Sequence, residues 1–200
     1  MSTPLPIVMA VTGASGAPYA VRLLQVLATA GQPVWLIVSP HGWRLLQTES
    51  GLPDLASLRE HVGRDAFDAT VQVFDDSDRG ATPASGSAKV KGMVIVPCSM
   101  GTIAAIAAGT SRSLVERAAD VSLKERRPLL VVPRETPLSR IHLENMLRIT
   151  DAGAVVLPAA PGFYHRPERI DQLVDFIVQR ILDQLQVNVD IAPRWGDPAE

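Results

Sequence analysis

Short apolar runs alternate along this chain with stretches in which apolar residues recur every three or four positions. The apolar runs are typical of strands that are buried on both faces. They predict strands at residues 7–12, 34–38, 71–74, 93–96, 129–132 and 154–157. The stretches with helical spacing predict helices that begin at residue 18 and others at residues 41–49, 55–62, 103–108, 114–125, 141–151 and 169–185.

Strands that alternate with helices favour a parallel sheet covered by helices on both faces. At 200 residues the chain is long enough for one domain with a hydrophobic core of its own. We therefore expect an α/β fold with a single doubly wound parallel sheet, a Rossmann- or flavodoxin-like three-layer sandwich. Residues 1–186 form this domain, and residues 187–200 form a C-terminal tail.

Turns rich in Ser, Gly and Pro follow the predicted strands. Pro97, Pro133 and Pro158 are expected to end the strands that precede them. In a parallel sheet of this kind the ligand binds at the carboxyl ends of the strands. The segments expected to meet at this edge are residues 13–16, 39–40, 97–102, 133–137 and 158–164.

The turn after the first strand has features of a phosphate site. Gly13 and Gly16 permit close approach, Ser15 adds a hydroxyl, and the helix that follows directs N–H groups and its positive end toward the turn. The pattern is not G-x-G-x-x-G, and the second strand ends in Ser39 where a dinucleotide site has an acid. Both departures favour a mononucleotide over NAD. The alternative is a turn that only connects strand to helix.

A second turn of this kind lies at residues 97–102. Its hydroxyl groups, on Ser99 and Thr102, can bind a flat heterocycle or its ribityl chain, or they can cap the helix that follows. The two interpretations are compatible. Cys98, the one cysteine of the chain, is expected to be a small buried residue without a chemical role.

Several charged residues are candidates for an anion site. Arg117 and Lys124 lie on one face of a predicted helix, for which a solvated surface is the alternative. Arg134 follows a strand at the binding edge. Arg180 falls inside the apolar arc of the last predicted helix, between Leu173 and Phe176, so we expect it to face inward and to be paired. Its partner is a structural carboxylate or a substrate phosphate.

The remaining composition excludes several classes of protein. The 19 Lys and Arg residues are balanced by 21 acids, so no basic face for nucleic acid is expected. No apolar run is long enough to span a membrane, no signal peptide is evident, and a lone cysteine fits a reducing, cytoplasmic location. The acids at residues 75–78 lack the spacing of a metal-dependent prenyltransferase, and the four histidines lack metal-ligand spacing, so no metal is expected.

Several motifs in order along residues 7–185 resemble those of the flavin prenyltransferase (UbiX) family. A short Pro-Arg-Trp-Gly motif in the tail adds to the resemblance. The motifs occupy residues 12–16, 83–87, 97–102, 116–120, 123–129, 132–135, 141–146, 158–164 and 193–196.

The resemblance implies a homododecamer in which FMN is held across subunit contacts, with the tail contributing to the site or to a subunit contact. The implied FMN contacts are Gly13, Ala14, Ser15, Ser39, Ser99, Met100, Gly101, Thr102 and Arg134. The implied contacts of the allylic substrate are Ser85, Arg117, Lys124, Arg134, Glu135, Tyr164, Arg180 and Trp195.

The family's reaction transfers a dimethylallyl group from dimethylallyl monophosphate to reduced FMN, first at N5 and then with ring closure at C6. By this resemblance Lys124, Arg134 and Arg180 stabilise the leaving phosphate, without a metal. Glu49, assisted by Ser15, transfers the proton of ring closure. Glu135 positions the phosphate or moves its proton, and Trp195 stabilises an allylic cation. The prenylated FMN then serves a UbiD-type decarboxylase.

Two rival functions remain at this point. An FMN-dependent decarboxylase of the phosphopantothenoylcysteine type shares the fold, but its early catalytic His and Pro-x-Met-Asn motif are not evident here. A flavin carrier without catalysis is the other rival. Arg180 together with Lys124, Arg134 and Glu135 favours a second, anionic ligand beside the flavin.

Overall fold

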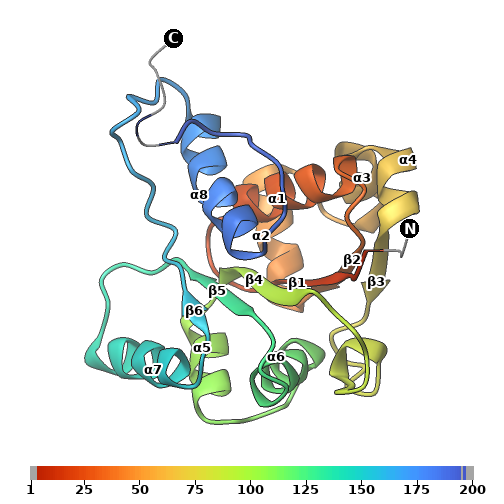
Figure 1. Cartoon of the computed structure of the whole chain (residues 1–200), viewed down its shortest axis with the longest axis vertical. Helices are drawn as coiled ribbons and strands as arrows, with labels where there is room; N and C mark the ends of the chain where they lie inside the picture. Colours follow the sequence, from red (N-terminus) through yellow and green to blue (C-terminus); the bar gives the residue numbers. More distant parts are fainter. Residues whose placement is uncertain (1–3, 195, 197–200) are drawn as a thin grey trace.

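The computed structural model describes residues 4–194 and residue 196. At its centre is one six-stranded sheet of parallel strands in the order β3-β2-β1-β4-β5-β6 (Figure 1). This is the order of a doubly wound Rossmann sheet, so the fold predicted from the sequence is confirmed. The strands are β1 (Ile7–Val11), β2 (Val34–Val38), β3 (Val71–Phe74), β4 (Gly92–Cys98), β5 (Leu129–Pro133) and β6 (Val155–Val156).

Helices cover both faces of the sheet and give three layers (Figure 1). In one layer α1 contacts α2, α3, α4 and α8, and in the other α5 contacts α6 and α7. The first layer contains α1 (Ala17–Thr29), α2 (Pro40–Ser50), α3 (Leu55–Val62), α4 (Arg64–Thr70) and α8 (Ile170–Gln184). The second layer contains α5 (Met100–Ala107), α6 (Leu114–Lys124) and α7 (Arg140–Asp151).

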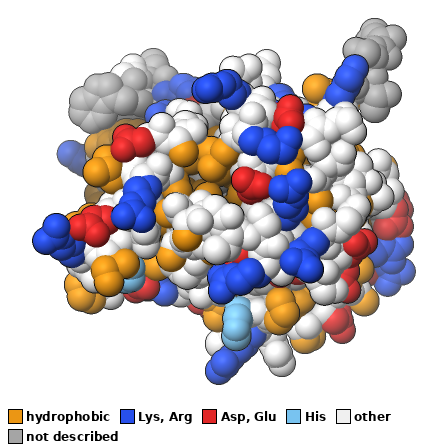
Figure 2. Space-filling model, turned by 90° about the horizontal axis from the view of Figure 1, so that it is seen from below, with side chains coloured by type: hydrophobic (Ala, Val, Ile, Leu, Met, Phe, Trp, Pro, Cys, Tyr) orange, Lys and Arg blue, Asp and Glu red, His pale blue; other side chains and the backbone are white. Residues whose placement is uncertain are grey.

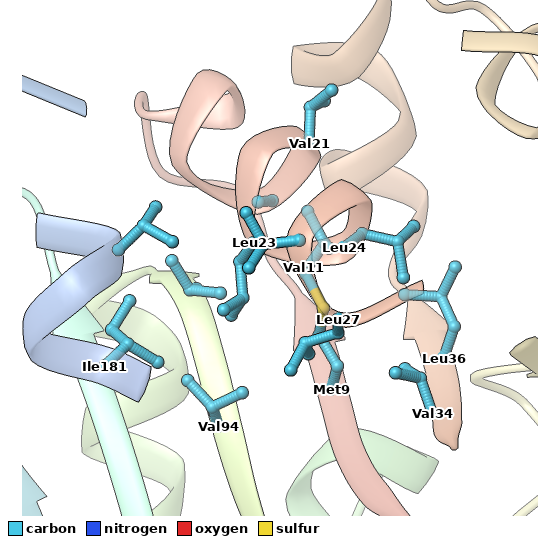
Figure 3. Close-up of a cluster of buried hydrophobic side chains, with 14 of the residues drawn as sticks. Met9, Val11, Val21, Leu23, Leu24, Leu27, Val34, Leu36, Val94 and Ile181 are labelled. Atoms are coloured by element: carbon cyan, nitrogen blue, oxygen red, sulfur yellow. The ribbon is translucent and has the colours of Figure 1, made fainter. Parts of the chain in front are cut away.

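The larger hydrophobic core lies between the sheet and the layer that contains α1 and α8 (Figure 3). Met9 of β1, Leu27 of α1 and Leu36 of β2 are fully buried there. Ile181 of α8 and Val94 of β4 extend the same cluster toward the middle of the sheet. Because burial of each such side chain contributes about 1.5–3 kcal/mol, this core holds β1 and β4 in a fixed relation. The ends of these two strands therefore provide a rigid base for a site.

Three elements differ from those predicted, among them α5, which begins at Met100, three residues before its predicted start. β4 continues through Pro97 to Cys98, although the sequence indicated that Pro97 ends the strand. Its pairing with β5 shifts register between Ile95 and Cys98, which accommodates a residue that lacks an N–H. In addition, residues 64–70 form α4, a helix that the apolar pattern did not predict.

The face that is seen from below in Figure 2 carries hydrophobic side chains between Lys and Arg side chains. Apolar side chains on α7 and on the residues just before it are also exposed. The exposed fraction of Ile141 is 67% and that of Leu147 is 61%. In the described part of the chain, no helix is long and apolar enough to cross a bilayer.

Candidate functional site

Two turns lie side by side at the carboxyl ends of the neighbouring strands β1 and β4. Buried Thr12 joins them, because its hydroxyl donates to the carbonyl of Pro97 at 3.0 Å and accepts the N–H of Ser99 at 2.9 Å. The turns at residues 13–16 and 99–102 therefore form one surface. This surface lies where the winding of the sheet reverses, the position at which doubly wound sheets bind ligands.

Four main-chain N–H groups of this surface have no acceptor within residues 4–194 and 196. They belong to Gly13 and Ser15 in the first turn and to Met100 and Gly101 in the second. Unpaired N–H groups on a rim of this kind are available for a ligand. They suit the carbonyl, ring-nitrogen and phosphate acceptors of a flavin mononucleotide, so these residues fit that group.

The glycines of the first turn are required for space as well as for backbone geometry. A Cβ added to Gly13 would lie 2.6 Å from Cβ of His41, at the start of α2. Gly16 has a φ of 128°, which L side chains rarely adopt. These two residues therefore let the ends of β1, α1 and α2 approach one another closely beneath the rim.

The N-terminus of α1 is occupied by Glu49 from the end of α2. Its Oε2 accepts the N–H groups of Gly16 and Ala17, each at 2.8 Å. The phosphate predicted for these helix N–H groups is therefore replaced by a carboxylate of the chain itself. Sequence reasoning could not see this contact, because Glu49 lies 33 residues from Gly16. A phosphate bound at this rim must use other donors.

The environment of Glu49 favours its ionised form. Partial burial raises the pKa of the carboxyl, but hydrogen bonds from Gly16, Ser15 and Ala17 and the charge of Arg134 outweigh it. The net effect is a pKa below the ordinary value of a glutamate. Near neutral pH Glu49 is therefore an ionised carboxylate beside the rim.

Hydroxyl groups cap the helices that follow β2 and β4. Ser99 accepts the N–H of Thr102 at 3.2 Å, and their hydroxyl oxygens are 2.9 Å apart. Ser39 accepts the N–H of Gly42 at 3.1 Å. The capping interpretation of Ser99 is thus confirmed, while contacts of Ser39 and Ser99 with a ligand stay a prediction. Ala14 lies in the first turn and is buried.

Arg134 connects the end of β5 to the first turn. Its Nε donates to the carbonyl of Ser15 at 3.2 Å, and the side chain is half-buried. The neighbouring Glu135 is exposed and accepts the N–H of Thr136 at 3.0 Å. The structure thus brings Arg134 together with Ser15 and Glu49. The sequence predicted that the segments of Arg134 and Ser15 meet at one edge.

Lys124 and Ser85 lie at the amino ends of the strands, at the edge opposite the binding rim. Lys124 ends α6 just before β5 begins, and it pairs with Glu125 beside Gly86. At about 3.3 Å per residue, the five residues of β5 separate this edge from Arg134 by about 17 Å. Within one chain, therefore, these two predicted cations do not meet at one small ligand. Arg117, earlier on α6, forms an ion pair with Asp120 at 2.6 Å.

The predicted orientation of Arg180 is wrong. Its side chain is 53% exposed and its Nη1 lies 3.2 Å from Asp183 of the same helix. The preceding polar residue, Gln179, is buried instead. The cause is tertiary, because the chain after α8 folds back over Gln179, while Leu173 and Phe176 are only half-buried. Arg180 as a phosphate ligand stays a prediction.

Tyr164, on the segment between β6 and α8, belongs to a cluster of three rings, one of which is on α8. It packs edge-on against His165 and Phe176, with ring centroids 5.5 Å and 5.8 Å away. Its exposed fraction is 47%, so it can reach a ligand. Trp195, the other predicted aromatic contact, lies outside the described residues.

The acids between β3 and the short 3₁₀ helix at Thr82–Ala84 act as turn and cap residues. Asp75 accepts the N–H of Ser77, Asp76 accepts the N–H of Val115, and Asp78 accepts the N–H of Gly80. Across residues 4–194 and 196, no group of three or more His, Cys, Asp or Glu side chains is arranged to hold a metal ion. A cavity of about 580 Å³ near Asp75 and Asp76 is lined mainly by apolar groups.

Sequence reasoning missed Thr12 and Asp183. Thr12 was visible as a polar residue at the end of an apolar run, directly before a glycine turn, which is a usable signal. Asp183, which holds Arg180 and Arg194, looked like any polar residue on the outer face of a helix. Only the fold of the tail distinguishes it.

Taken together, the doubly wound sheet, the joined turns at its switch point and the free N–H donors define a mononucleotide-binding α/β protein. The family model named Flavoprotein matches residues 1–182. The flavin prenyltransferase UbiX of Pseudomonas aeruginosa is 50% identical over 204 residues, which cover 98% of this chain and 97% of the relative. The chain therefore belongs to the flavoprotein family, among the relatives named flavin prenyltransferase UbiX.

Solved structures agree with this placement. The crystal structure of AnUbiX in complex with FMN and dimethylallyl pyrophosphate has a TM-score of 0.90 and 38% identity, covering 98% of this chain and 100% of that one. A dodecameric FMN-dependent UbiX-like decarboxylase from Escherichia coli O157:H7 has a TM-score of 0.85 and 41% identity, covering 96% and 99%.

Proposed function

We propose that this chain is a flavin prenyltransferase, which transfers the dimethylallyl group of dimethylallyl monophosphate to reduced FMN. The observation that carries the proposal is the arrangement at the switch point. Unpaired N–H donors of Gly13, Ser15, Met100 and Gly101 lie beside an ionised Glu49. Membership of the family and the FMN-bound AnUbiX structure support it.

FMN would lie against the two joined turns. When bound in its reduced form it supplies an electron-rich ring whose N5 and C6 accept the allyl group. Ser39 and the segment from Ser99 to Thr102 would bind its polar groups, and Gly13, Ala14 and Ser15 would pack against it through the first turn. The rigid core beneath β1 and β4 supports this orientation, because it fixes both turns before any ligand arrives.

Glu49 and Ser15 would move the proton that ring closure requires. The carboxylate is held by two N–H groups at 2.8 Å, so its free oxygen has a defined direction. Its lowered pKa keeps it ionised at neutral pH, the form that accepts a proton. The Ser15 hydroxyl, which interacts with the same carboxylate, is placed to relay that proton.

The leaving phosphate would be stabilised by Arg134, Lys124 and Arg180. Cations that face a departing anion lower the barrier most when they are held in place beforehand. Arg134 meets this condition through its hydrogen bond to Ser15. Ser85, Arg117, Tyr164 and Trp195 would complete the substrate contacts, and Glu135 would position the phosphate or carry its proton.

The separation between Lys124 and Arg134 supports a site shared between copies of the chain. Each copy would contribute its switch-point rim to one site and its Lys124 edge to another, and the homododecamer would be held together in part by the exposed apolar side chains of α7. The dodecameric Escherichia coli relative supports this assembly. Sedimentation of the purified protein should show a particle of about twelve chains and no stable monomer.

Mixed assemblies test the sharing directly. Lys124→Ala and Glu49→Gln should each be nearly inactive alone. If one site takes Lys124 and Glu49 from different copies, random co-assembly of the two variants restores about a quarter of the sites. Activity that stays at the level of the separate variants would contradict a shared site.

We also propose that the transfer needs no metal ion. The acids nearest to a magnesium motif, Asp75, Asp76 and Asp78, already accept main-chain N–H groups. The yield of prenylated FMN should be the same with magnesium as with a chelator. A cytoplasmic location and delivery of the product to a UbiD-type decarboxylase complete the proposal. The free thiol of Cys98 fits the reducing environment of that compartment.

The decisive experiment is an anaerobic incubation of the protein with reduced FMN and dimethylallyl monophosphate, followed by mass measurement of the extracted flavin. The proposed enzyme adds one five-carbon unit. A carrier returns the flavin unchanged, and a decarboxylase does so too but releases carbon dioxide from an added carboxylic acid. A parallel incubation with dimethylallyl pyrophosphate, the ligand of AnUbiX, tells whether the monophosphate is preferred.

A further inference from the structure

The chain after α8 folds back along this helix and is held there by Gln179. The buried amide of Gln179 donates to the carbonyl of Val189 at 3.1 Å and accepts the N–H of Ile191 at 2.7 Å. These two bonds pair a side chain with backbone on both sides of residue 190, as a neighbouring strand would. They fix the path of the tail and bring Arg194 to the C-terminal end of α8.

Arg194 meets Asp183 of α8, which also contacts Arg180. The two oxygens of Asp183 accept Nη1 and Nη2 of Arg194 at 3.2 Å and 3.0 Å, a bidentate pair. Arg180 makes a single contact with Asp183, from Nη1 at 3.2 Å. Asp183 is thus shared unequally between two guanidinium groups, one from the tail and one from the helix.

This unequal sharing determines how much positive charge Arg180 presents. A carboxylate that pairs with Arg180 alone would neutralise it and would compete with a phosphate for the same N–H groups. Arg194 also pairs with Asp190 at 2.6 Å, so the two arginines and two aspartates together carry no net charge. Because the forked pair with Arg194 occupies both oxygens of Asp183, that carboxylate is not left to neutralise Arg180 alone. Within the described residues, Arg180 donates to Asp183 alone, and its side chain is 53% exposed. It therefore remains open to an anion.

We propose that Arg194 is a positioning residue for the substrate phosphate: by occupying Asp183, it keeps Arg180 available as the phosphate ligand. The inference rests on the proposed function in taking Arg180 as a ligand of the allylic phosphate. It adds a defined electrostatic role for the tail, because docking of residues 187–194 then controls the affinity of the site for the phosphate.

The test compares the KM for dimethylallyl monophosphate in two variants at saturating reduced FMN. Arg194→Ala frees Asp183 to pair fully with Arg180, so the KM should rise about 5- to 10-fold with little change in kcat. Adding Asp183→Asn to Arg194→Ala removes the competing carboxylate, and the KM should return to within about twofold of the wild type. Both variants lack Arg194, so any loosening of the tail is common to them.

A purely structural role for Arg194 gives the opposite result. In that case the double variant is at least as impaired as Arg194→Ala, and the proposal is overturned. Asp190→Asn is the matched control, since Asp190 pairs with Arg194 at 2.6 Å but, within the described residues, makes no hydrogen bond or ion pair with Arg180. Its KM should match the wild type within about twofold.

A binding measurement separates this inference from the proposed function. Inorganic phosphate, titrated calorimetrically into the FMN-loaded protein, reports the anion site without any turnover. The wild type and the double variant should bind it about 5- to 10-fold more tightly than Arg194→Ala. Failure of the wild type to prenylate FMN, with this order of phosphate affinities intact, refutes the function alone. Equal phosphate affinities in all three proteins refute the role of Arg194.

Discussion

The two turns that form the rim look alike in sequence, yet the helices that follow them are capped in different ways. After β4, α5 is capped within its own turn, where Ser99 accepts the N–H of Thr102 at 3.2 Å. After β1, α1 is capped by Glu49, which lies 32 residues beyond Ala17 in the chain. One cap is a neutral hydroxyl from the turn itself, and the other is a charged group brought in from another helix.

The difference separates two tasks at one rim. A local hydroxyl cap stabilises its helix in any surroundings, so the second turn is a fixed binding surface. A carboxylate cap responds to pH and can exchange a proton, so the first turn has chemistry as well as shape. Variants that act on one turn while sparing the other therefore test whether this division holds.

The largest effect is expected from Glu49→Gln. The amide oxygen can still accept the N–H groups of Gly16 and Ala17, but the side chain can no longer accept a proton. Formation of ring-closed product should fall about 100-fold or more while the fold is retained. Mass measurement of the extracted flavin over time checks the rate. Glu60→Gln, a surface carboxylate on α3, is the control, and a normal rate in Glu49→Gln would remove Glu49 from the chemistry.

Substitution of a glycine in each turn should separate them by stability. In Gly13→Ala the new methyl group meets Cβ of His41 at 2.6 Å, so the free energy of unfolding should fall by about 1–3 kcal/mol. In Gly101→Ala the nearest atom is Oγ of Ser99 at 3.8 Å, and no loss beyond about 0.5 kcal/mol is expected. Urea unfolding of both variants measures the difference. Equal losses would show that the first turn is no more crowded than the second.

Removal of the local cap should have a smaller effect. Ser99→Ala removes the N-cap of α5, so the free energy of unfolding should fall by about 1 kcal/mol. It should also weaken FMN binding, because Ser99 is a predicted FMN contact and Thr102, another one, loses its hydroxyl partner. Ser139→Ala removes an equivalent cap from α7, away from the rim, where Ser139 accepts the N–H of His142. It should cost similar stability without any change in FMN affinity, as measured by flavin fluorescence. Similar FMN affinities in the two variants would exclude Ser99 from flavin binding.

The smallest effect concerns acid stability. Because the pKa of Glu49 is lower in the folded chain than its ordinary value of 4.5, its stabilisation is complete above that value. It is lost as the pH falls below 4.5 and through the folded pKa. At neutral pH the wild type should exceed Glu49→Gln by about 0.3–1 kcal/mol at most, since the side chain is exposed. Urea midpoints of both proteins should converge in acid, and a difference that is independent of pH would contradict the assignment.

Much of the fold was predictable because burial on both faces leaves a strong local pattern. The runs at β2 and β5 are apolar throughout, and the structure confirms both strands within one residue. The binding edge was predictable for the same reason, since every parallel strand carries its next turn to the same side. Arg134 followed from this rule, and it lies beside Ser15. Helix α8 was misread because periodicity reports which side of a helix is apolar, not which side the tail will cover.

The sequence by itself thus determined the alternation of strands and helices, the rim at their carboxyl ends and the family motifs that lie there, because each depends on residues near one another in the chain. Only the tertiary structure decided that Glu49 caps α1, that Arg180 is exposed and that Asp183 joins it to Arg194. These contacts depend on how whole helices pack and on where the tail runs. Their energies arise between segments far apart in sequence, which leave no local pattern to read.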